Sequence, residues 1–391
     1  MRLEKRVQAS VLALMLAPCA AIAVTLAVSS LLVLWAGAPV AQTFGLLFQG
    51  AFGSVFAWSE TLTRAIPLIL TGLSVTVAFK ARLFNIGAEG QLYAGALAAI
   101  AVGGLHGGTG FALSLWLLFP LMLLAAALAG ALLLLGPALM KNKLGVDEVV
   151  TTLLLNFIVL LGVSALLDGP MKDPLALGWP QSVALQGDLE LAKLIPQTRV
   201  HTGLLLGLAL AGLTWAFFKY TVPGFDIRAV GANPRAAAFA GVRVTRTVVL
   251  TALLSGALAG LAGAIEVAGR TSYVTLDMSP GYGYSGIVIA MLAGLHPLGV
   301  VLASLFVAGV LVGADSMSRA IAVPTYIADV IVATALLAVL VAALFTQYRI
   351  RWKTRSTVGP SQGSRSVTPS EAQDQPARGG SDSLAVRERG G

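Results

Sequence analysis

Charged residues are scarce in this sequence. Only 11% of its 391 residues are Asp, Glu, Lys or Arg, whereas 57% are hydrophobic, and the mean hydropathy is +0.85. A soluble domain carries about 25% charged residues, so this chain has too little polar surface to cover a globule of its size. The composition excludes a soluble protein of two or three domains and predicts an all-α polytopic membrane protein.

Residues that build catalytic and metal sites are also rare. The single cysteine excludes an internal disulfide. The spacing of the three histidines (His106, His201 and His296) is not typical of metal ligands. No lysine follows a glycine, so the chain lacks the Gly-Lys-[Ser/Thr] step with which P-loop ATPases hold phosphate. We therefore expect no catalytic site, no metal site and no ATPase site of that kind in this chain.

Long apolar runs take up most of the sequence. A helix needs roughly 20 mostly apolar residues to cross the hydrocarbon core, which is about 30 Å thick. We expect about ten transmembrane helices, at residues 10–35, 62–79, 84–104, 111–139, 149–167, 201–218, 247–268, 281–295, 298–317 and 322–346. The eighth run is short and the third begins with polar residues, so both are candidates for broken or re-entrant helices. Gly256 and Gly260 have the spacing of close helix–helix packing.

The positive charges fall on one side of these predicted helices. Basic residues follow the second, fourth, sixth and last helices, whereas the loop of residues 168–200 balances its charges with acids. By the positive-inside rule, the basic side and both termini are cytoplasmic and this loop is external. The net charge of +8 therefore reflects topology, and we expect no nucleic-acid partner. Residues 1–348 are expected to form the transmembrane domain, and residues 349–391 a disordered basic cytoplasmic tail.

Five acidic or basic residues lie at or near the later apolar runs: Glu266, Arg270, Asp315, Arg319 and Asp329. Most of them can lie at the outer boundaries of the membrane. Asp329 falls inside the last run, and a charge at that depth requires a partner.

The most informative polar interruption is Phe84-Asn85-Ile86-Gly87-Ala88-Glu89-Gly90-Gln91. Amides and a carboxylate at the edge of a membrane helix are costly unless they face protein or water. The glycines permit a break in the helix, and broken helices form substrate sites in transporters. One interpretation assigns Asn85, Glu89 and Gln91 to a substrate pathway. The alternative is an interfacial loop and helix cap, with Glu89 favoured by the helix dipole.

A second polar stretch runs from Gly145 to Asn156. Thr152 and Asn156 are four residues apart and share one helical face. They belong to a polar pathway or hydrogen-bond a neighbouring helix, and both interpretations stay open. Asp147 and Glu148 are placed to cap the start of the helix.

The third feature lies in the most basic loop, at residues 230–242. Asn233 is a good N-cap, Pro234 suits the first helical position, and Gly241 suits the end of a helix. We expect an alanine-rich helix of about two turns between them, and so short a helix needs tertiary or partner contacts to stay folded. It is either an interfacial helix on the lipid headgroups or a docking helix for another protein.

Taken in order, these three segments resemble the permease subunit of bacterial ABC importers of the branched-chain amino acid, ribose and nucleoside group. Within that group the match is closest to the nucleoside, or simple sugar, permeases, and it covers about residues 60–345. The resemblance implies a multi-pass subunit of the bacterial cytoplasmic (inner) membrane. It also implies three partners: a second related permease, an ABC ATPase subunit that uses ATP and Mg, and an extracytoplasmic substrate-binding protein.

The resemblance further implies that the short helix couples the permease to the ATPase, through Gly231, Asn233, Pro234, Arg235, Ala236, Ala237 and Gly241. Phe239 departs from the family pattern, which more often has a tyrosine or another polar residue there. The expected function is import of nucleosides, with ribose-like sugars and branched-chain amino acids as alternatives. An ion-coupled secondary transporter would instead need buried titratable relays, for which Glu89 and Asp329 are the candidates.

Overall fold

The structure is a computed structural model. It describes two long stretches, residues 40–104 and 114–321, together with most of residues 23–39, isolated residues between 330 and 342, and the strand residues 2–5 and 348–351. The first and last predicted membrane helices, like Asp329, therefore fall largely or wholly outside the described residues. The chain divides into two compact units, Lys5–Arg349 and a smaller one made of Met1–Glu4 and Ile350–Gly391.

The two terminal segments meet in a short sheet. β1 (Arg2–Lys5) pairs with β2 (Tyr348–Arg351) as a two-stranded sheet. Residues 352–391 lie outside the described residues, so disorder of the basic tail stays a prediction.

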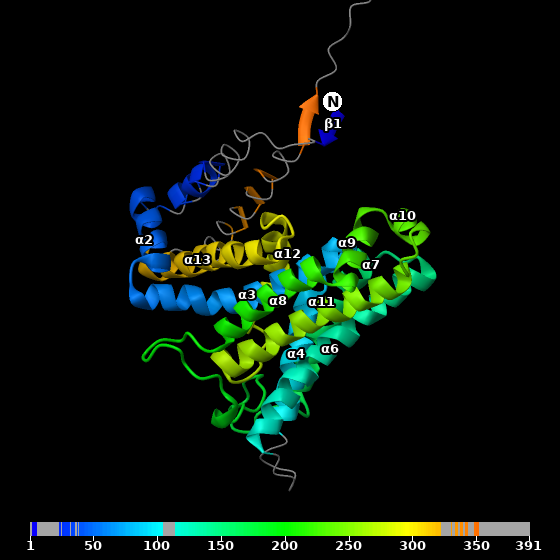
Figure 1. The fold of residues 1–391 in the computed structure, drawn as a ribbon. Coiled ribbons are helices and arrows are strands. Elements are labelled where there is room, and N and C mark those ends of the chain that lie inside the picture. The colour runs from blue at the N-terminus through cyan, green and yellow to red at the C-terminus, as the bar shows by residue number, and fades with distance from the viewer. Residues whose placement is uncertain are drawn as a thin grey trace, which may run out of the picture. The chain divides into compact units, whose positions relative to one another are not determined.

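The larger unit is a helical, multi-pass membrane domain (Figure 1). Within its described part, six helices are long and apolar enough to cross a membrane: α3 (Val55–Lys80), α6 (Leu115–Leu144), α7 (Glu148–Asp168), α8 (Gly203–Tyr220), α11 (Val244–Glu266) with the π-helical turn η2 (Val267–Thr271), and α13 (Pro297–Ile321). They coincide with the second, fourth, fifth, sixth, seventh and ninth predicted helices. Apolar run length was sufficient to predict these six.

The two runs that the sequence marks as broken or re-entrant form shorter helices. α4 (Ala88–Gly103) begins after a non-helical break, and α12 (Tyr282–Leu292) has only 11 residues. At 1.5 Å per residue α12 is about 17 Å long, too short for a hydrocarbon core of about 30 Å. α2 (Val40–Phe52) precedes α3 and corresponds to no predicted membrane helix.

Close packing around α11 organises the helices. α11 packs against α3, α4 and α6. A Cβ on Gly256 would lie 2.3 Å from the carbonyl oxygen of Gly130, and one on Gly260 would lie 2.1 Å from that of Ala126. Only glycine allows backbones to approach so closely, and the approach predicted at Gly256 and Gly260 is confirmed.

α3 forms the second axis of the domain. It packs against α8, α12 and α13 as well as α11, and α2 packs on α13. Figure 1 shows α3 and α13 side by side. After α8 the chain forms α9 (Val222–Ala232) and the six-residue α10 (Pro234–Phe239).

Lys80, Arg82 and Lys141 gather where α3 ends, and we call this region the basic end. Lys141 Nζ donates a hydrogen bond to the carbonyl oxygen of Arg82 (2.8 Å). A Cβ on Gly231 in α9 would lie 1.8 Å from the carbonyl oxygen of Lys80, so the loop that carries α10 adjoins the same end. Three of the basic residues to which we applied the positive-inside rule thus lie in one region.

The start of α3, η2, the end of α13 and residues 169–202 form the opposite region, which we call the loop end. The loop of residues 169–202 is folded and contains a short 3₁₀ turn, η1 (Gly187–Leu189). Ser182 donates its backbone N–H to Val274 (3.0 Å), and Leu191 donates to Ala268 in η2 (2.7 Å). The long loop is therefore fastened to the end of α11.

Candidate functional site

A buried pair of amides holds the break between α3 and α4. Asn85 Nδ2 donates to Gln91 Oε1, and Gln91 Nε2 donates to Asn85 Oδ1, both at 2.9 Å. Asn85 also accepts from the backbone N–H of Gly87 (2.9 Å) and donates to Ser255 Oγ on α11 (3.1 Å). Because buried polar groups are costly without partners, this reciprocal pair fixes the turn from which α4 starts.

α7 is bound to the same break. Asn156 Oδ1 accepts from the backbone N–H of Gly90 (2.8 Å), and its Nδ2 donates to the carbonyl oxygen of Ile86 (2.9 Å) and to the hydroxyl of Tyr284 (3.2 Å). Thr152 Oγ1 accepts from the backbone N–H of Ile86 (3.2 Å). Thr152 and Asn156 thus share one buried face of α7, as their spacing predicts.

Glu89 lies where the N-terminal ends of α4 and α12 meet. Its Oε2 accepts a hydrogen bond from the backbone N–H of Gly283 (2.6 Å). A Cβ on Gly283 would lie 2.2 Å from the backbone nitrogen of Glu89, so a larger residue there would force the helices apart. The positive ends of two helices face one carboxylate, which favours its position.

The five residues assigned to a substrate pathway form one group, which we call the polar cluster: Asn85, Glu89, Gln91, Thr152 and Asn156. Each is at most 3% exposed, and each makes hydrogen bonds within the chain. The helix cap and the helix–helix contacts of the alternative interpretations are thus present. A solute could reach these groups only if α4 separated from α7 or α12, and their role in a pathway stays a prediction.

Asp147 caps the start of α7 as predicted, whereas Glu148 is the first helical residue and has other partners. Asp147 accepts from the backbone N–H of Val149 (2.8 Å). Glu148 pairs with Lys141 (2.5 Å) and accepts from the backbone N–H of Phe84 (3.2 Å). These contacts join the ends of α6, α7 and the break before α4.

The expected short helix is present as α10. Asn233 Oδ1 accepts from the backbone N–H groups of Arg235 (3.0 Å) and Ala236 (3.2 Å), and Gly241 follows with a φ of +87°. Ala237 is buried in a cluster with Val230 of α9 and other apolar side chains of the same chain. The turn of α10 is therefore held by its own protein.

The outward face of α10 carries an aromatic side chain. Phe239 is 95% exposed, whereas Ala237 faces inward. Sequence reasoning assigned the coupling role to seven residues from Gly231 to Gly241 that include Ala236 and Ala237, and it treated Phe239 as a departure from the family pattern. The helix has only six residues. The sequence therefore could not show which of its sides faces its own protein.

A groove of about 620 Å³ lies between α9 and the start of α11, at the turn that follows α10. Phe225, Asp226, Arg243 and Arg246 are among its lining residues. The basic end thus presents a cleft next to the short helix, a shape suited to contact with another protein.

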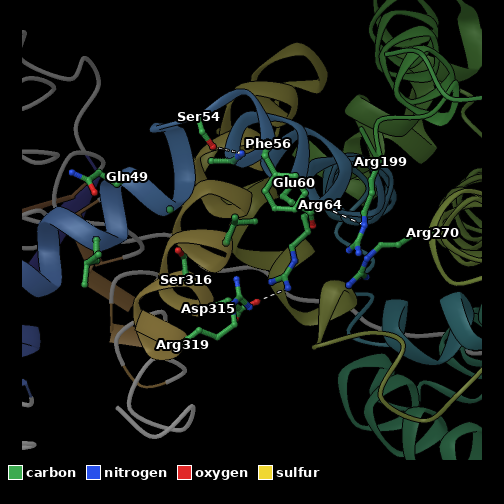
Figure 2. A pocket seen from close by; sticks show the side chains of 14 residues that line it. Gln49, Ser54, Phe56, Glu60, Arg64, Arg199, Arg270, Asp315, Ser316 and Arg319 are labelled. Atoms are coloured by element: carbon green, nitrogen blue, oxygen red, sulfur yellow. Dashed lines mark hydrogen bonds and ion pairs between the residues drawn. The ribbon is translucent and has the colours of Figure 1, made fainter. Parts of the chain in front are cut away.

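A second cavity lies at the loop end and was not predicted. Its volume is about 550 Å³, and we call it the charged cavity because its lining includes Glu60, Arg64, Arg199, Arg270, Asp315 and Arg319. Figure 2 shows these side chains converging from α3, the loop, η2 and α13. In the part of the chain that the structure describes, no group of three or more His, Cys, Asp or Glu side chains could hold a metal ion.

Ion pairs in this region join different elements. Arg64 of α3 pairs with Asp315 of α13, and Arg199 of the loop lies 3.5 Å from Glu60 of α3. Arg270 pairs with Glu266, which is buried behind it. A sequence signal for the region does exist, because an acid precedes an arginine by four residues three times within residues 1–348: at Glu60 and Arg64, at Glu266 and Arg270, and at Asp315 and Arg319.

His201 fastens the loop end from inside. Its ring is buried, and a Cβ on Gly269 of η2 would lie 2.1 Å from it. Nδ1 accepts from the backbone N–H of Gly203 (3.2 Å), and the buried Nε2 has no hydrogen-bond partner among the described residues. Burial lowers the pKa of His201 to about 4, so the ring is neutral near pH 7.

Known proteins are similar to this chain over most of its length. Residues 57–340 match the family described as "Branched-chain amino acid transport system / permease component". The guanosine ABC transporter permease protein NupP of Bacillus subtilis is 35% identical over 83% of this chain and 92% of its own. A glucose ABC transporter permease of Haloferax volcanii is 37% identical over 79% of this chain and 82% of its own. The nucleoside permease NupB of Lactococcus lactis is 31% identical over 70% and 76%.

Proposed function

Because this chain belongs to the family of branched-chain amino acid transport system permease components and is the permease component of an ABC importer, we propose that it moves nucleosides into the cell. The similarity to the guanosine permease, which extends over 92% of that relative, carries this proposal. The nucleoside permease of Lactococcus lactis supports it independently.

The alternatives are ribose-like sugars and branched-chain amino acids. The glucose permease among the relatives favours a sugar-bearing solute, and a nucleoside carries a sugar. Branched-chain amino acids enter through the family description alone and have no hydroxyl groups. We therefore place nucleosides first, other hydroxyl-bearing solutes second and branched-chain amino acids third.

The source of energy lies in another subunit. Membership of an ABC permease family implies association with an ATPase and a substrate-binding protein. We propose in addition that a second related permease completes the transmembrane pore, that this chain has no ATPase chemistry and binds no cofactor, and that ATP and Mg act in the ATPase. The missing Gly-Lys-[Ser/Thr] step supports this division of labour.

The proposed setting is the bacterial cytoplasmic (inner) membrane. We propose about ten transmembrane passes, some of them broken, with both termini and the basic end in the cytoplasm and the loop end outside. The gathering of Lys80, Arg82 and Lys141 in one region supports this orientation.

Solute would pass the polar cluster in a second conformation of the permease. The N-terminal ends of α4 and α12 are hydrogen-bonded at this place, to Asn156 in the middle of α7 and to each other through Glu89. A separation of these helices would expose amides and Glu89 to a solute. Broken helices of this kind supply polar groups at membrane depth in transporters. This supports a pathway role for Asn85, Glu89, Gln91, Thr152 and Asn156.

α10 is proposed as the coupling helix. The capped turn at Asn233 and Pro234, followed by Gly241, sets the helix rigidly on the basic end. Ala236 and Ala237 keep the helix small, and Arg235 is exposed on it. Gly231 lets the preceding helix, α9, approach the end of α3. A rigid helix with exposed Phe239 can transmit a displacement across an interface, where a loose loop would absorb it.

Uptake by the complete importer tests the function. We expect liposomes that contain both permeases, the ATPase and the binding protein to accumulate guanosine when ATP is supplied. Omission of ATP, with a proton or sodium gradient in its place, should abolish accumulation, which separates this function from that of an ion-coupled transporter. Accumulation of leucine but not guanosine would contradict the nucleoside assignment.

A further inference from the structure

The charged cavity has no role in the function proposed so far. It lies beside Glu60 and Arg64, near the start of the 26-residue α3. The polar cluster and α10 adjoin the other end of that helix, since Asn85 follows it and Gly231 touches Lys80. In the proposed orientation, a solute delivered from outside meets this cavity before it meets the polar cluster.

The charges of the cavity largely compensate one another. Arg64, Arg199 and Arg270 each lie next to a carboxylate, and Arg319 is the one lining arginine without an ion-pair partner among the residues that the structure describes. An anion such as phosphate would have to compete with these carboxylates. A neutral solute with both hydrogen-bond donors and acceptors can bind to either sign of charge without that competition.

The hydrogen bonds around the cavity are incomplete. Arg64 Nε and Glu60 Oε1 are buried and have no hydrogen-bond partner within the described chain. For Glu60 Oε1, the 3.5 Å separation from Arg199 Nε is too long for a good hydrogen bond. Buried polar atoms left in this way are satisfied by water or by a ligand. Both residues line the cavity, and its volume of about 550 Å³ has room for either water or a ligand.

The lining also offers an apolar face. Phe56 lines the cavity and is 60% exposed. Any nucleobase can stack on an aromatic side chain, because every base has a π-face. Guanidinium groups donate to the O6 and N7 atoms of guanine, and carboxylates accept from hydroxyl groups. The cavity's volume falls within the range of small-molecule sites, about 300–1,000 Å³.

We propose that the charged cavity is an uptake site for an uncharged nucleoside, in which Glu60 and Asp315 accept hydrogen bonds from the ribose hydroxyls. The arginines donate to the base, and Phe56 stacks on it. This inference rests on the proposed function, because it names the place where the transported solute first binds to the permease.

Protection of a cysteine in the cavity tests the site directly. Ser316 lines the cavity, and we would introduce Ser316→Cys after replacing the single natural cysteine by Cys19→Ala. Guanosine at ten times its Kd should slow labelling of this cysteine by a membrane-impermeant thiol reagent about tenfold in the assembled permease–ATPase complex. Asp188→Cys is the matched control, because Asp188 is exposed on the same loop end and outside the cavity lining.

Two further probes separate the chemistry of the ligand. 2′,3′-Dideoxyguanosine, which lacks the hydroxyls, should protect Ser316→Cys far less than guanosine does, and inorganic phosphate alone should not protect. Equal labelling with and without guanosine would overturn the site. Equal protection by phosphate would show an anion site instead, and equal protection by the dideoxy compound would overturn the role of the carboxylates.

A transport measurement with Glu60→Gln gives a second, independent test. We expect the KM for guanosine to rise about tenfold, as for the loss of one charge-assisted hydrogen bond, with the KM for 2′,3′-dideoxyguanosine unchanged. An equal change in both values would show a structural role only and overturn the proposal. The matched control is Glu190→Gln, an exposed loop carboxylate bonded to Ser272 (2.6 Å), which should alter neither value.

The outcomes for the site and for the function are distinguishable. Guanosine uptake by the unsubstituted importer without protection of Ser316→Cys leaves the proposed function standing and overturns the cavity assignment. Protection without uptake supports the binding site and contradicts nucleoside transport.

Discussion

The polar cluster and the charged cavity lie toward opposite ends of α3 and satisfy their polar groups in opposite ways. In the polar cluster, neutral amides and hydroxyls bond one another and the backbone at 2.6–3.2 Å, and its one carboxylate accepts from a helix N-terminus. In the charged cavity, full charges pair across three elements, and two buried atoms have no hydrogen-bond partner among the residues that the structure describes. The polar cluster satisfies its hydrogen bonds within the chain, whereas the charged cavity leaves two polar atoms without a partner in the described chain.

The difference indicates what each region can do. A fully bonded buried network specifies one arrangement of its helices. A conformational change that separates these helices must break its hydrogen bonds. A cavity with unmet hydrogen bonds holds water, and a ligand that reproduces those bonds can displace that water. We therefore assign the positioning of helices to the first region and the initial binding of solute to the second.

The largest expected effect breaks the polar cluster. Asn85→Ala removes four hydrogen bonds and leaves Gln91 and Ser255 partly unpaired in a buried place. We expect a loss of about 4 kcal/mol in the free energy of unfolding, since each buried polar group left unpaired costs about 1–3 kcal/mol. Retention of folded permease after heating, measured by size-exclusion chromatography, checks this value.

The matched control for Asn85→Ala is Asn142→Ala. The side-chain nitrogen of Asn142 has no hydrogen-bond partner among the described residues, so its removal should leave heat resistance almost unchanged. Equal losses in the two variants would show that the hydrogen bonds of the polar cluster do not hold the break before α4.

The long helices could be predicted because their signal is local. A run of apolar residues reveals its length directly, and the glycines and amides after α3 reveal where a helix breaks. The bonding of Asn156 to Gly90 could not be predicted from spacing, because it joins segments 66 residues apart. The sequence shows which residues are polar within the membrane, but it does not show which of them meet.

The charged cavity was missed for a related reason. Three acid–arginine pairs at a spacing of four residues suggest ion pairs within single helices, and Glu266 with Arg270 forms one. Arg64 instead pairs with Asp315 from another helix. The pairing between helices depends on how α3 and α13 pack, which the spacing within one helix does not show. Residues from all three pairs therefore line one cavity instead of separate surfaces.

The second prediction sharpens the comparison at the loop end. Glu266 is 1% exposed and pairs with Arg270, so Glu266→Gln leaves a guanidinium without its compensating charge. Because removing one partner of a buried ion pair costs about 3–5 kcal/mol, and glutamine can still accept one hydrogen bond, we expect the low end of that range. The same heat-resistance measurement applies, and the exposed Glu190→Gln should change it by less than about 0.5 kcal/mol.

The third prediction concerns pH at the loop end. Burial lowers the pKa of His201 from 6.5 to about 4, so the unfolded loop binds a proton more readily than the folded one. Stability is therefore full above about pH 6.5 and falls as the pH drops toward 4, by about 2 kcal/mol at pH 5. Hydrogen exchange, corrected for intrinsic rates, should show weaker protection of residues 185–202 at pH 5 than at pH 7, with α10 unaffected.

The control for this pH effect is His201→Phe, which keeps an aromatic ring against Gly269 without a titratable group. Loss of the pH dependence in that variant would support the argument. A loop that loosens equally in both proteins at pH 5 would place the acid-sensitive group elsewhere.

The smallest expected effect on stability is at the other end of the molecule. Phe239 is 95% exposed on α10, so Phe239→Ala removes almost no packing and should change heat resistance by less than about 0.5 kcal/mol. Exposed aromatic residues are frequent anchors of protein interfaces, however, and their truncation costs about 2 kcal/mol or more of binding. We therefore expect normal membrane abundance but much lower ATP-driven guanosine uptake, because the ATPase loses its contact with α10. Phe157→Ala on α7, a phenylalanine that is 55% exposed, is the matched control and should transport normally.

Ala237→Arg is a weaker test, since Ala237 packs inside its own chain and the variant would disturb α10 itself. Undiminished uptake and ATPase binding in Phe239→Ala would show that α10 does not couple the two subunits through this side chain.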